Sequence, residues 1–152
     1  MIKFIFIFLI ILNFQDNEQL EGRWKMYEAE AFLNILSSSN FMLGTEVQQK
    51  EIAETFQFAL DNTYYSFKGD SIFFTDTGAR NMLNHKNGKW LVRSDTLIIF
   101  ESKKIKTHKY LIESLKDNKL IMKIIFPNGE VSLSNMKFKK VELGYTIIYL
   151  VF

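Results

Sequence analysis

Residues 106–126 decide the fold, and they read KTHKYLIESLKDNKLIMKIIF. Successive side chains of an extended strand point to opposite faces, so every second residue shares a face. In the first half of this stretch the mainly apolar face carries His108, Tyr110 and Ile112. In the second half it carries Leu120, Met122, Ile124 and Phe126. The polar run Lys116-Asp117-Asn118 between them predicts a hairpin with one apolar and one mixed face.

Similar turn signals continue outward from this hairpin through the chain from Leu20 onward. They recur about every 8–12 residues between β-branched and aromatic runs, which is typical of a β-sandwich or barrel. We expect turns at Asp61-Asn62, Gly69-Asp70, Asn87-Gly88, Ser94-Asp95 and Pro127-Asn128-Gly129. The first would follow a strand at Phe56-Gln57-Phe58, and the last would precede a strand at Glu130–Lys140. The sequence therefore predicts an all-β fold, an antiparallel up-and-down barrel of about 8–10 strands, because closure creates an inside and removes exposed strand edges.

One segment after the first strand departs from this pattern. Residues 32–54 contain Thr45-Glu46-Val47-Gln48, which has the spacing of a capping box at the start of a helix. We expect one short helix of about two turns over Glu46–Ala53. It could lie over one end of the barrel as a lid or serve as a plain connection.

An unbroken apolar run, Phe4–Leu12, follows Lys3 and stops at Asn13. This order of charge, apolar segment and polar boundary is typical of a secretory signal peptide, which we assign to residues 1–15. The run has roughly half of the ~20 apolar residues that a bilayer-spanning helix needs. No triplet of small residues follows it, so cleavage, an uncleaved tether and a buried N-terminal strand all stay open. We expect an exported protein, periplasmic or secreted.

Composition excludes several classes of protein. The chain has no cysteine, which excludes disulfide scaffolds, thiol enzymes and cysteine-ligated metal centres. Charged residues of both signs make up 24% and leave a net charge of +2, so there is no general field that would hold a nucleic acid. The 47% hydrophobic and 15% aromatic content excludes intrinsic disorder, and 152 residues suffice for one domain with a core.

The end of the chain, residues 142–152, is predicted to form an apolar strand or tail. After Gly144 the run Tyr145–Phe152 is almost wholly apolar. Outer-membrane barrels commonly end in this way, but the charged middle strands supply too little lipid-facing surface for that class. A last strand that closes the sheet and a segment that docks a partner protein through 144–152 are the remaining alternatives.

The stretch Leu20–Met26 resembles the opening strand of lipocalin-like domains, in which a G-x-W motif, here Gly22 and Trp24, begins the barrel. Later features also resemble the small exported lipocalin-like proteins of bacteria, and together they cover residues 20–141: Tyr65–Asp70, Gly88-Lys89-Trp90, Tyr110–Leu120 and Lys137–Lys140. The resemblance implies that the glycine lets the chain bend and that the tryptophan plugs the closed end of a cup-shaped barrel. It also implies an interior able to take a small hydrophobic molecule.

Two departures from the family pattern are visible. A second lipocalin signature, T-D-Y, is matched in its first two residues by Thr75-Asp76-Thr77. The arginine that stacks over the tryptophan from the final strand is replaced at best by Lys137, Lys139 or Lys140, which lack the planar guanidinium. The chain is therefore either a divergent relative or a look-alike of this family, and no ligand specificity carries over.

We expect the ligand to lie among inward-facing side chains of the barrel. The predicted ligand-binding residues are Tyr65, Phe67, Phe74, Trp90, His108, Tyr110, Met122 and Met136. Rings and methionines of this kind make an adaptable apolar wall, and the alternative is that they simply fill a small barrel. Lys103–Lys106 with Lys109 forms a positive patch, which is either a solvated loop or a peripheral contact with an anionic head group or membrane surface.

The sequence favours binding over catalysis. Its two histidines, His85 and His108, are not spaced as a metal-ligand pair; we expect His85 in a turn and His108 inside the barrel. We predict no catalytic residue, metal or cofactor, and a small apolar molecule as the partner. The alternatives are a protein-interaction module with a filled barrel and a small barrel enzyme that uses His108.

Overall fold

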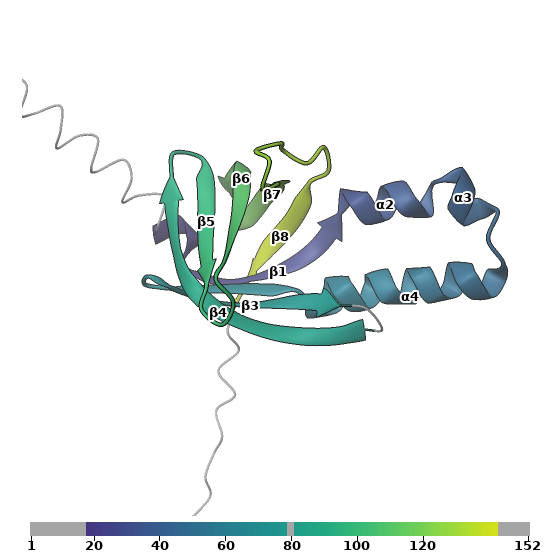
Figure 1. The fold of residues 1–152 in the computed structure, drawn as a ribbon, viewed down its shortest axis with the longest axis horizontal. Coiled ribbons are helices and arrows are strands. Elements are labelled where there is room, and N and C mark those ends of the chain that lie inside the picture. The colour runs from purple at the N-terminus through teal and green to yellow at the C-terminus, as the bar shows by residue number, and fades with distance from the viewer. Residues whose placement is uncertain (1–17, 79–80, 143–152) are drawn as a thin grey trace, which may run out of the picture.

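The computed structural model describes residues 18–78 and 81–142. The predicted signal peptide at 1–15 and the partner-docking tail at 144–152 lie outside the described residues. The strands are β1 (Gly22–Ala29), β2 (Tyr64–Lys68), β3 (Ser71–Gly78), β4 (Met82–Arg93), β5 (Thr96–Glu101), β6 (Lys106–Lys116), β7 (Lys119–Ile125) and β8 (Met136–Val141). Each strand pairs antiparallel with the next, and β8 pairs with β1 (Figure 1). The predicted up-and-down barrel is confirmed, with eight strands in the described residues.

The β6–β7 hairpin has the predicted turn, and the part next to the turn has the predicted buried face. Ile124 and Phe126, predicted on the same face, are 38% and 45% exposed, and Phe126 lies beyond the end of β7. Asp117 and Asn118 occupy the turn with φ of 53° and 56°, the left-handed region that a two-residue hairpin turn requires. Leu120 and Met122 on β7 are fully buried, and Tyr110 on β6 is 7% exposed. The turns at Gly69-Asp70 and Ser94-Asp95 are likewise confirmed by the pairing of the strands on either side.

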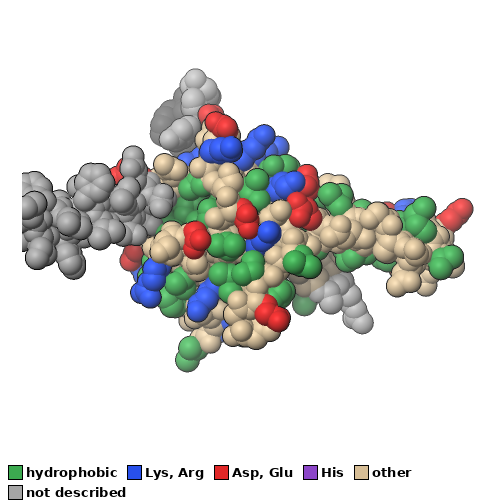
Figure 2. Space-filling view, turned by 90° about the horizontal axis from the view of Figure 1, so that it is seen from above, with side chains coloured by type: hydrophobic (Ala, Val, Ile, Leu, Met, Phe, Trp, Pro, Cys, Tyr) green, Lys and Arg blue, Asp and Glu red, His purple; other side chains and the backbone are tan. Residues whose placement is uncertain are grey.

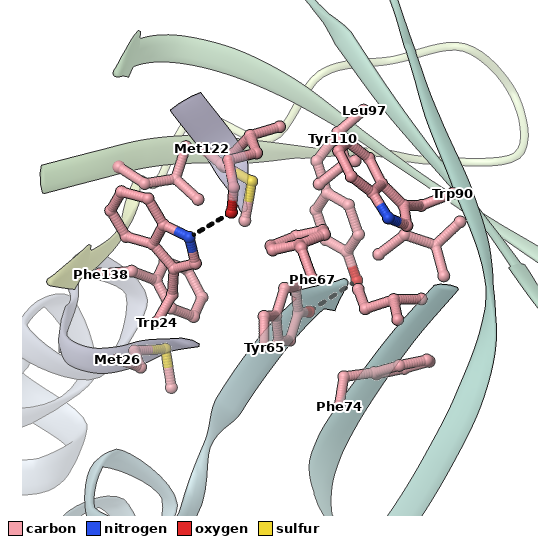
Figure 3. Close-up of a cluster of buried hydrophobic side chains, with 14 of the residues drawn as sticks. Trp24, Met26, Tyr65, Phe67, Phe74, Trp90, Leu97, Tyr110, Met122 and Phe138 are labelled. Atoms are coloured by element: carbon pink, nitrogen blue, oxygen red, sulfur yellow. Dashed lines mark hydrogen bonds between the residues drawn. The ribbon is translucent and has the colours of Figure 1, made fainter. Parts of the chain in front are cut away.

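Trp24 plugs one end of the barrel, which we call the closed end. Its side chain is 1% exposed, and the indole Nε1 donates a hydrogen bond of 2.8 Å to the carbonyl oxygen of Leu20 (Figure 3). Nζ of Lys140, on the last strand, lies 5.3 Å from the centre of the indole ring. A lysine therefore supplies the cation over the tryptophan at this end.

The segment between β1 and β2 is more helical than the sequence indicated. It forms α2 (Glu30–Leu36), α3 (Ser39–Met42) and α4 (Glu46–Asn62). The capping box is present, since Thr45 and Gln48 exchange hydrogen bonds at the start of α4. However, α4 runs well beyond the expected end at Ala53, so the predicted strand at Phe56-Gln57-Phe58 and the turn at Asp61-Asn62 are wrong.

The physical reason is a helical contact between segments distant in sequence. The ring of Phe56 on α4 stacks on the ring of Phe32 on α2, with centroids 4.2 Å apart. Ala59, three residues further along α4, is buried against the barrel, which is the spacing of one helix face. The three helices form an arm that extends away from one end of the barrel instead of lying flat over it (Figures 1 and 2).

The predicted turn at Asn87-Gly88 is also wrong, because β4 runs straight through both residues. Gly88 faces Glu101 on β5, and a Cβ at this position would collide with the backbone carbonyl of Phe100. The glycine thus allows close approach of two strand backbones. His85 consequently lies in β4, opposite Thr75, and not in a turn. Likewise Pro127-Asn128-Gly129 does form a turn, but the final strand begins at Met136 instead of Glu130.

Replacing Gly88 with alanine should therefore destabilise the barrel. We expect Gly88→Ala to lower the free energy of unfolding by about 1–3 kcal/mol, because the new methyl group forces the β4 and β5 backbones apart. Gly78→Ala is the control: its Cβ would meet the flexible Asn84 side chain at 3.3 Å, and we expect a change within about 0.5 kcal/mol. Urea unfolding of the two variants measures the difference, and equal losses would contradict the assigned role of Gly88.

Candidate functional site

A cavity of about 370 Å³ lies inside the barrel at the end opposite Trp24, which we call the open end. Inward-facing residues of seven strands line it, together with Phe32 of α2 and Ala59 of α4. Its apolar lining residues are Met26, Phe32, Ala59, Phe74, Ile124, Met136 and Phe138. Its lining residues with polar groups are Thr63, Tyr65, Thr75, Asp76, Thr77, Lys86, Lys106, His108 and Tyr110. The volume is within the range that holds a small molecule.

The cavity continues toward the surface between β6 and β7. A neighbouring hollow of about 480 Å³ runs along the ends of these strands and shares His108, Tyr110 and Ile124 with the cavity. Its outer rim includes Lys106 and Lys109 of the predicted positive patch, and Phe126 and Pro127 of the loop before β8. The rim therefore combines lysines with exposed apolar side chains.

The structure brings five of the eight predicted ligand-binding residues to the cavity. These are Tyr65, Phe74, His108, Tyr110 and Met136. The other three, Phe67, Trp90 and Met122, are 2%, 6% and 0% exposed and pack in the layer between the cavity and the closed end (Figure 3). The barrel is thus filled in one half and hollow in the other. Contact of these residues with a ligand stays a prediction.

Sequence reasoning missed Lys86 and Glu101, although a signal for both was present. Trp90 faces the interior, so period-two alternation along an unbroken β4 places Gly88 and Lys86 on the same face. Because a turn was expected at Asn87-Gly88, the alternation from Trp90 was not extended to Lys86. Glu101 continues the inward face of β5 after Leu97 and Ile99, and its side chain is 4% exposed.

These residues form a chain of charged groups along the wall of the cavity. Oε2 of Glu101 lies 3.0 Å from Nε2 of His108 and 3.5 Å from Nζ of Lys86. The same Nζ lies 3.0 Å from Oδ2 of Asp76. Two carboxylates thus share one ammonium, which is the arrangement that makes burial of these charges tolerable.

The carboxylate of Glu101 and the ammonium of Lys86 each stabilise the charged form of the other. Burial by itself would raise the pKa of Glu101, but the hydrogen bond with His108 and the charge of Lys86 lower it below its ordinary value. Burial by itself would lower the pKa of Lys86, but Asp76 and Glu101 raise it above its ordinary value. The carboxylate and the ammonium therefore both stay charged near neutral pH.

Two tyrosine hydroxyls meet in the lining of the cavity. The hydroxyl of Tyr65 donates a hydrogen bond of 3.0 Å to that of Tyr110 (Figure 3). Burial raises the pKa of Tyr110 and raises that of Tyr65 well above its ordinary value. Both hydroxyls are therefore protonated and can act as hydrogen-bond donors over the physiological pH range.

Residues 18–78 and 81–142 contain neither a candidate metal centre nor a helix that could span a membrane. These residues contain no group of three or more His, Asp or Glu side chains placed to hold a metal ion. Nor do they include a helix with the length and apolar character needed to cross a bilayer.

The described residues form a closed barrel of eight antiparallel strands that begins at Gly22-Arg23-Trp24, is closed at one end by the tryptophan and is hollow at the other. This arrangement resembles the barrels of lipocalin-like proteins. No family model matches the chain, and no curated protein matches it. A lipocalin-like protein from Bacteroides uniformis is similar in structure, with 12% identity and a TM-score of 0.48 over 81% of this chain and 99% of that one.

Two other solved structures show a comparable degree of likeness. A protein from Bacteroides eggerthii has 12% identity and a TM-score of 0.46 over 80% of this chain and 99% of that one. A variant of a fatty acid transporter has 16% identity and a TM-score of 0.37 over 82% of this chain and 99% of that one.

The charged contacts of Glu101 predict how stability depends on pH. Because the folded-state pKa of Glu101 is lowered, its contribution to stability is present above the unfolded pKa of about 4.3 and is lost as pH falls through the folded value. We expect the unfolding free energy of the wild type to fall below about pH 4.3 more steeply than that of Glu101→Gln. Urea unfolding at several pH values measures both curves.

The control for the change in net charge is Glu113→Gln, which removes a carboxylate from an ion pair with Lys123 on partly exposed side chains. Its curve should keep the wild-type shape. If the unfolding free energies of wild type and Glu101→Gln fall equally steeply at acid pH, ionisation of Glu101 does not contribute to the stability of the fold.

Proposed function

We propose that the protein binds a small, largely apolar molecule in the cavity at the open end of the barrel. The observation that carries this proposal is the interior hollow of about 370 Å³ with apolar lining residues from β1, α2, β3, β7 and β8. Small-molecule sites are concave, with apolar walls and a few placed polar groups, and this cavity combines a concave shape with apolar and polar lining residues. Its lining thus supports binding better than a purely structural role for the barrel.

Affinity would come from removing apolar surface of the ligand from water. Burial of apolar surface contributes about 25 cal/mol per Å² before the cost of immobilising the ligand is subtracted. Met26 and Met136 contribute flexible side chains to the lining, and thioethers adjust to differently shaped ligands. The packed layer of Phe67, Trp90 and Met122 below the cavity provides a rigid floor.

Filling the cavity should abolish this binding. We expect the neutral, polarity-sensitive dye Nile red to bind the wild type at one saturable site with a blue-shifted emission. Met136→Trp should weaken that binding at least about tenfold, since the larger ring occupies ligand space. Fluorescence titration gives the two dissociation constants.

The matched control is Met42→Trp, the same substitution at a methionine that is 69% exposed on α3. It should bind the dye as the wild type does. An absence of saturable binding to the wild type, or equal affinities for wild type and Met136→Trp, would refute the cavity as a binding site.

Binding without catalysis is part of the proposal. Among the described residues the ring of His108 hydrogen-bonds with Glu101, and no hydroxyl group is placed beside it as a nucleophile. The imidazole and carboxylate are thereby engaged in the charged wall of the cavity. This arrangement supports a role in shaping the site.

Export of the barrel is a separate proposal, supported by Lys3 and the apolar run Phe4–Leu12. We expect the full chain, expressed in a bacterium with two membranes, to appear in the periplasmic or extracellular fraction. A double substitution, Leu9→Asp and Ile10→Asp, should retain it in the cytoplasm because the apolar segment is interrupted. Immunoblotting of the fractions checks this, and intact-mass measurement tells a cleaved protein from a tethered one. Cytoplasmic accumulation of the wild type would contradict export.

A further inference from the structure

The titratable and tyrosine groups of the cavity come from β2, β3, β4 and β6. Phe74 of β3 lies among them, with its ring centre 5.7 Å from those of Tyr65 and His108. Lys86, His108, Tyr65 and Tyr110 come from β2, β4 and β6, whereas Met26, Met136 and Phe138 come from β1 and β8. Figure 3 shows the hydroxyls of Tyr65 and Tyr110 directed toward each other, with Met26 and Phe138 across from Tyr110. A ligand that fills this space must therefore be amphipathic, with its polar end toward the tyrosines and Lys86.

The buried charges in the wall of the cavity cancel each other. The side chains of Lys86 and Glu101 are 16% and 4% exposed, and they are in contact with one another. Asp76 places a second carboxylate on the same ammonium. Lys106 is exposed at the rim, where water screens its charge. The wall thus has no uncompensated buried cation among the described residues.

A carboxylate ligand would meet an unfavourable field at this wall. To reach Nζ of Lys86, its oxygens would have to approach an atom that already has two carboxylates within 3.5 Å. Like charges at such distances repel strongly where water is excluded. The desolvation of a carboxylate, which is costly without a free opposite charge, would not be repaid.

An uncharged oxygen would instead find a donor. The Tyr65–Tyr110 pair has two hydroxyl protons, and the hydrogen bond between the rings uses one of them. Within the described ranges no acceptor takes the other, so a carbonyl or hydroxyl oxygen of the ligand can accept it. Supplying that acceptor also removes the cost of leaving a buried donor without a partner.

We propose that the cavity selects amphipathic molecules whose polar end is an uncharged oxygen, a hydroxyl or carbonyl group, over molecules that end in a carboxylate. This inference rests on the proposed function, because it names the ligand chemistry of the same cavity. The selectivity arises from the two carboxylates on Lys86 and from the free hydroxyl proton of the tyrosine pair.

The test compares two ligands of equal chain length, decan-1-ol and decanoate, as competitors of Nile red at pH 7.5. We expect decan-1-ol to bind the wild type at least about tenfold more tightly than decanoate. Because an alcohol also partitions more readily into any apolar site, a variant must show that the wall is responsible. Asp76→Asn removes one carboxylate from Lys86 at a side chain that is 56% exposed, where substitution leaves the core intact.

We expect Asp76→Asn to lower the preference for the alcohol by about fivefold, mainly by improving decanoate binding; the modest size reflects the exposure of Asp76. Asp70→Asn is the matched control, since it makes the same change in charge at a turn residue paired with Lys89. It should leave the preference unchanged.

The outcomes distinguish failure of the proposed ligand selectivity from failure of cavity binding itself. Decanoate binding as tightly as decan-1-ol would overturn the inference and leave the cavity as an apolar binding site. A preference that is the same in wild type, Asp76→Asn and Asp70→Asn would also overturn it, because the preference would then be simple partitioning. Failure of Nile red and of both ligands to bind would refute the proposed function itself.

Discussion

The pairing of the first strand with the last is the interaction on which the rest of the structure depends. Hydrogen bonds between β1 and β8 run from the Arg23–Val141 pair to the Ala29–Met136 pair and close the sheet. Lys137 reinforces this seam from the outside, with its ammonium 2.7 Å from Glu28 and 3.6 Å from Glu30. Without closure there would be no interior, because an open sheet leaves both its edges unpaired and one face in water. Closure also places Lys140 over Trp24 and brings Met26 beside the last strand.

The interior that closure creates has a packed half and a hollow half. Around Trp24 the side chains of Leu20, Leu120 and Met122 are fully buried and contribute apolar burial to stability. Toward the open end the lining becomes half polar, with Glu101 and Lys86 in a buried contact. Buried ion pairs add little to stability, because desolvation offsets their attraction. The proposed effect of this ion pair is on the electric field inside the cavity, and through that field on the choice of ligand.

Local signals predicted the hairpins well and the helical arm poorly. The turn at Asp117-Asn118 follows from residues that tolerate positive φ, and the alternation of β6 and β7 follows from their own sequences. The run Phe56-Gln57-Phe58 also alternates between apolar and polar residues, as a strand would. However, Phe56 stacks on Phe32, and this contact between distant residues cannot be inferred from the local sequence. Gly88 was misread for a similar reason, since the collision that requires glycine involves the backbone of Phe100 on another strand.

The sequence by itself determined the closed antiparallel barrel and the G-x-W motif at its start. It also determined which side chains face the interior, Tyr65 and Tyr110 among them. Strand periodicity and turn chemistry are properties of adjacent residues, so they can be recognised without the tertiary structure. Only the tertiary structure decided which inward residues pack and which line a cavity. It also decided that Lys86 and Glu101 meet, since strand register brings together residues 15 positions apart. The division between floor and cavity depends on the volume left when all eight strands are in place, and no single strand contains that information.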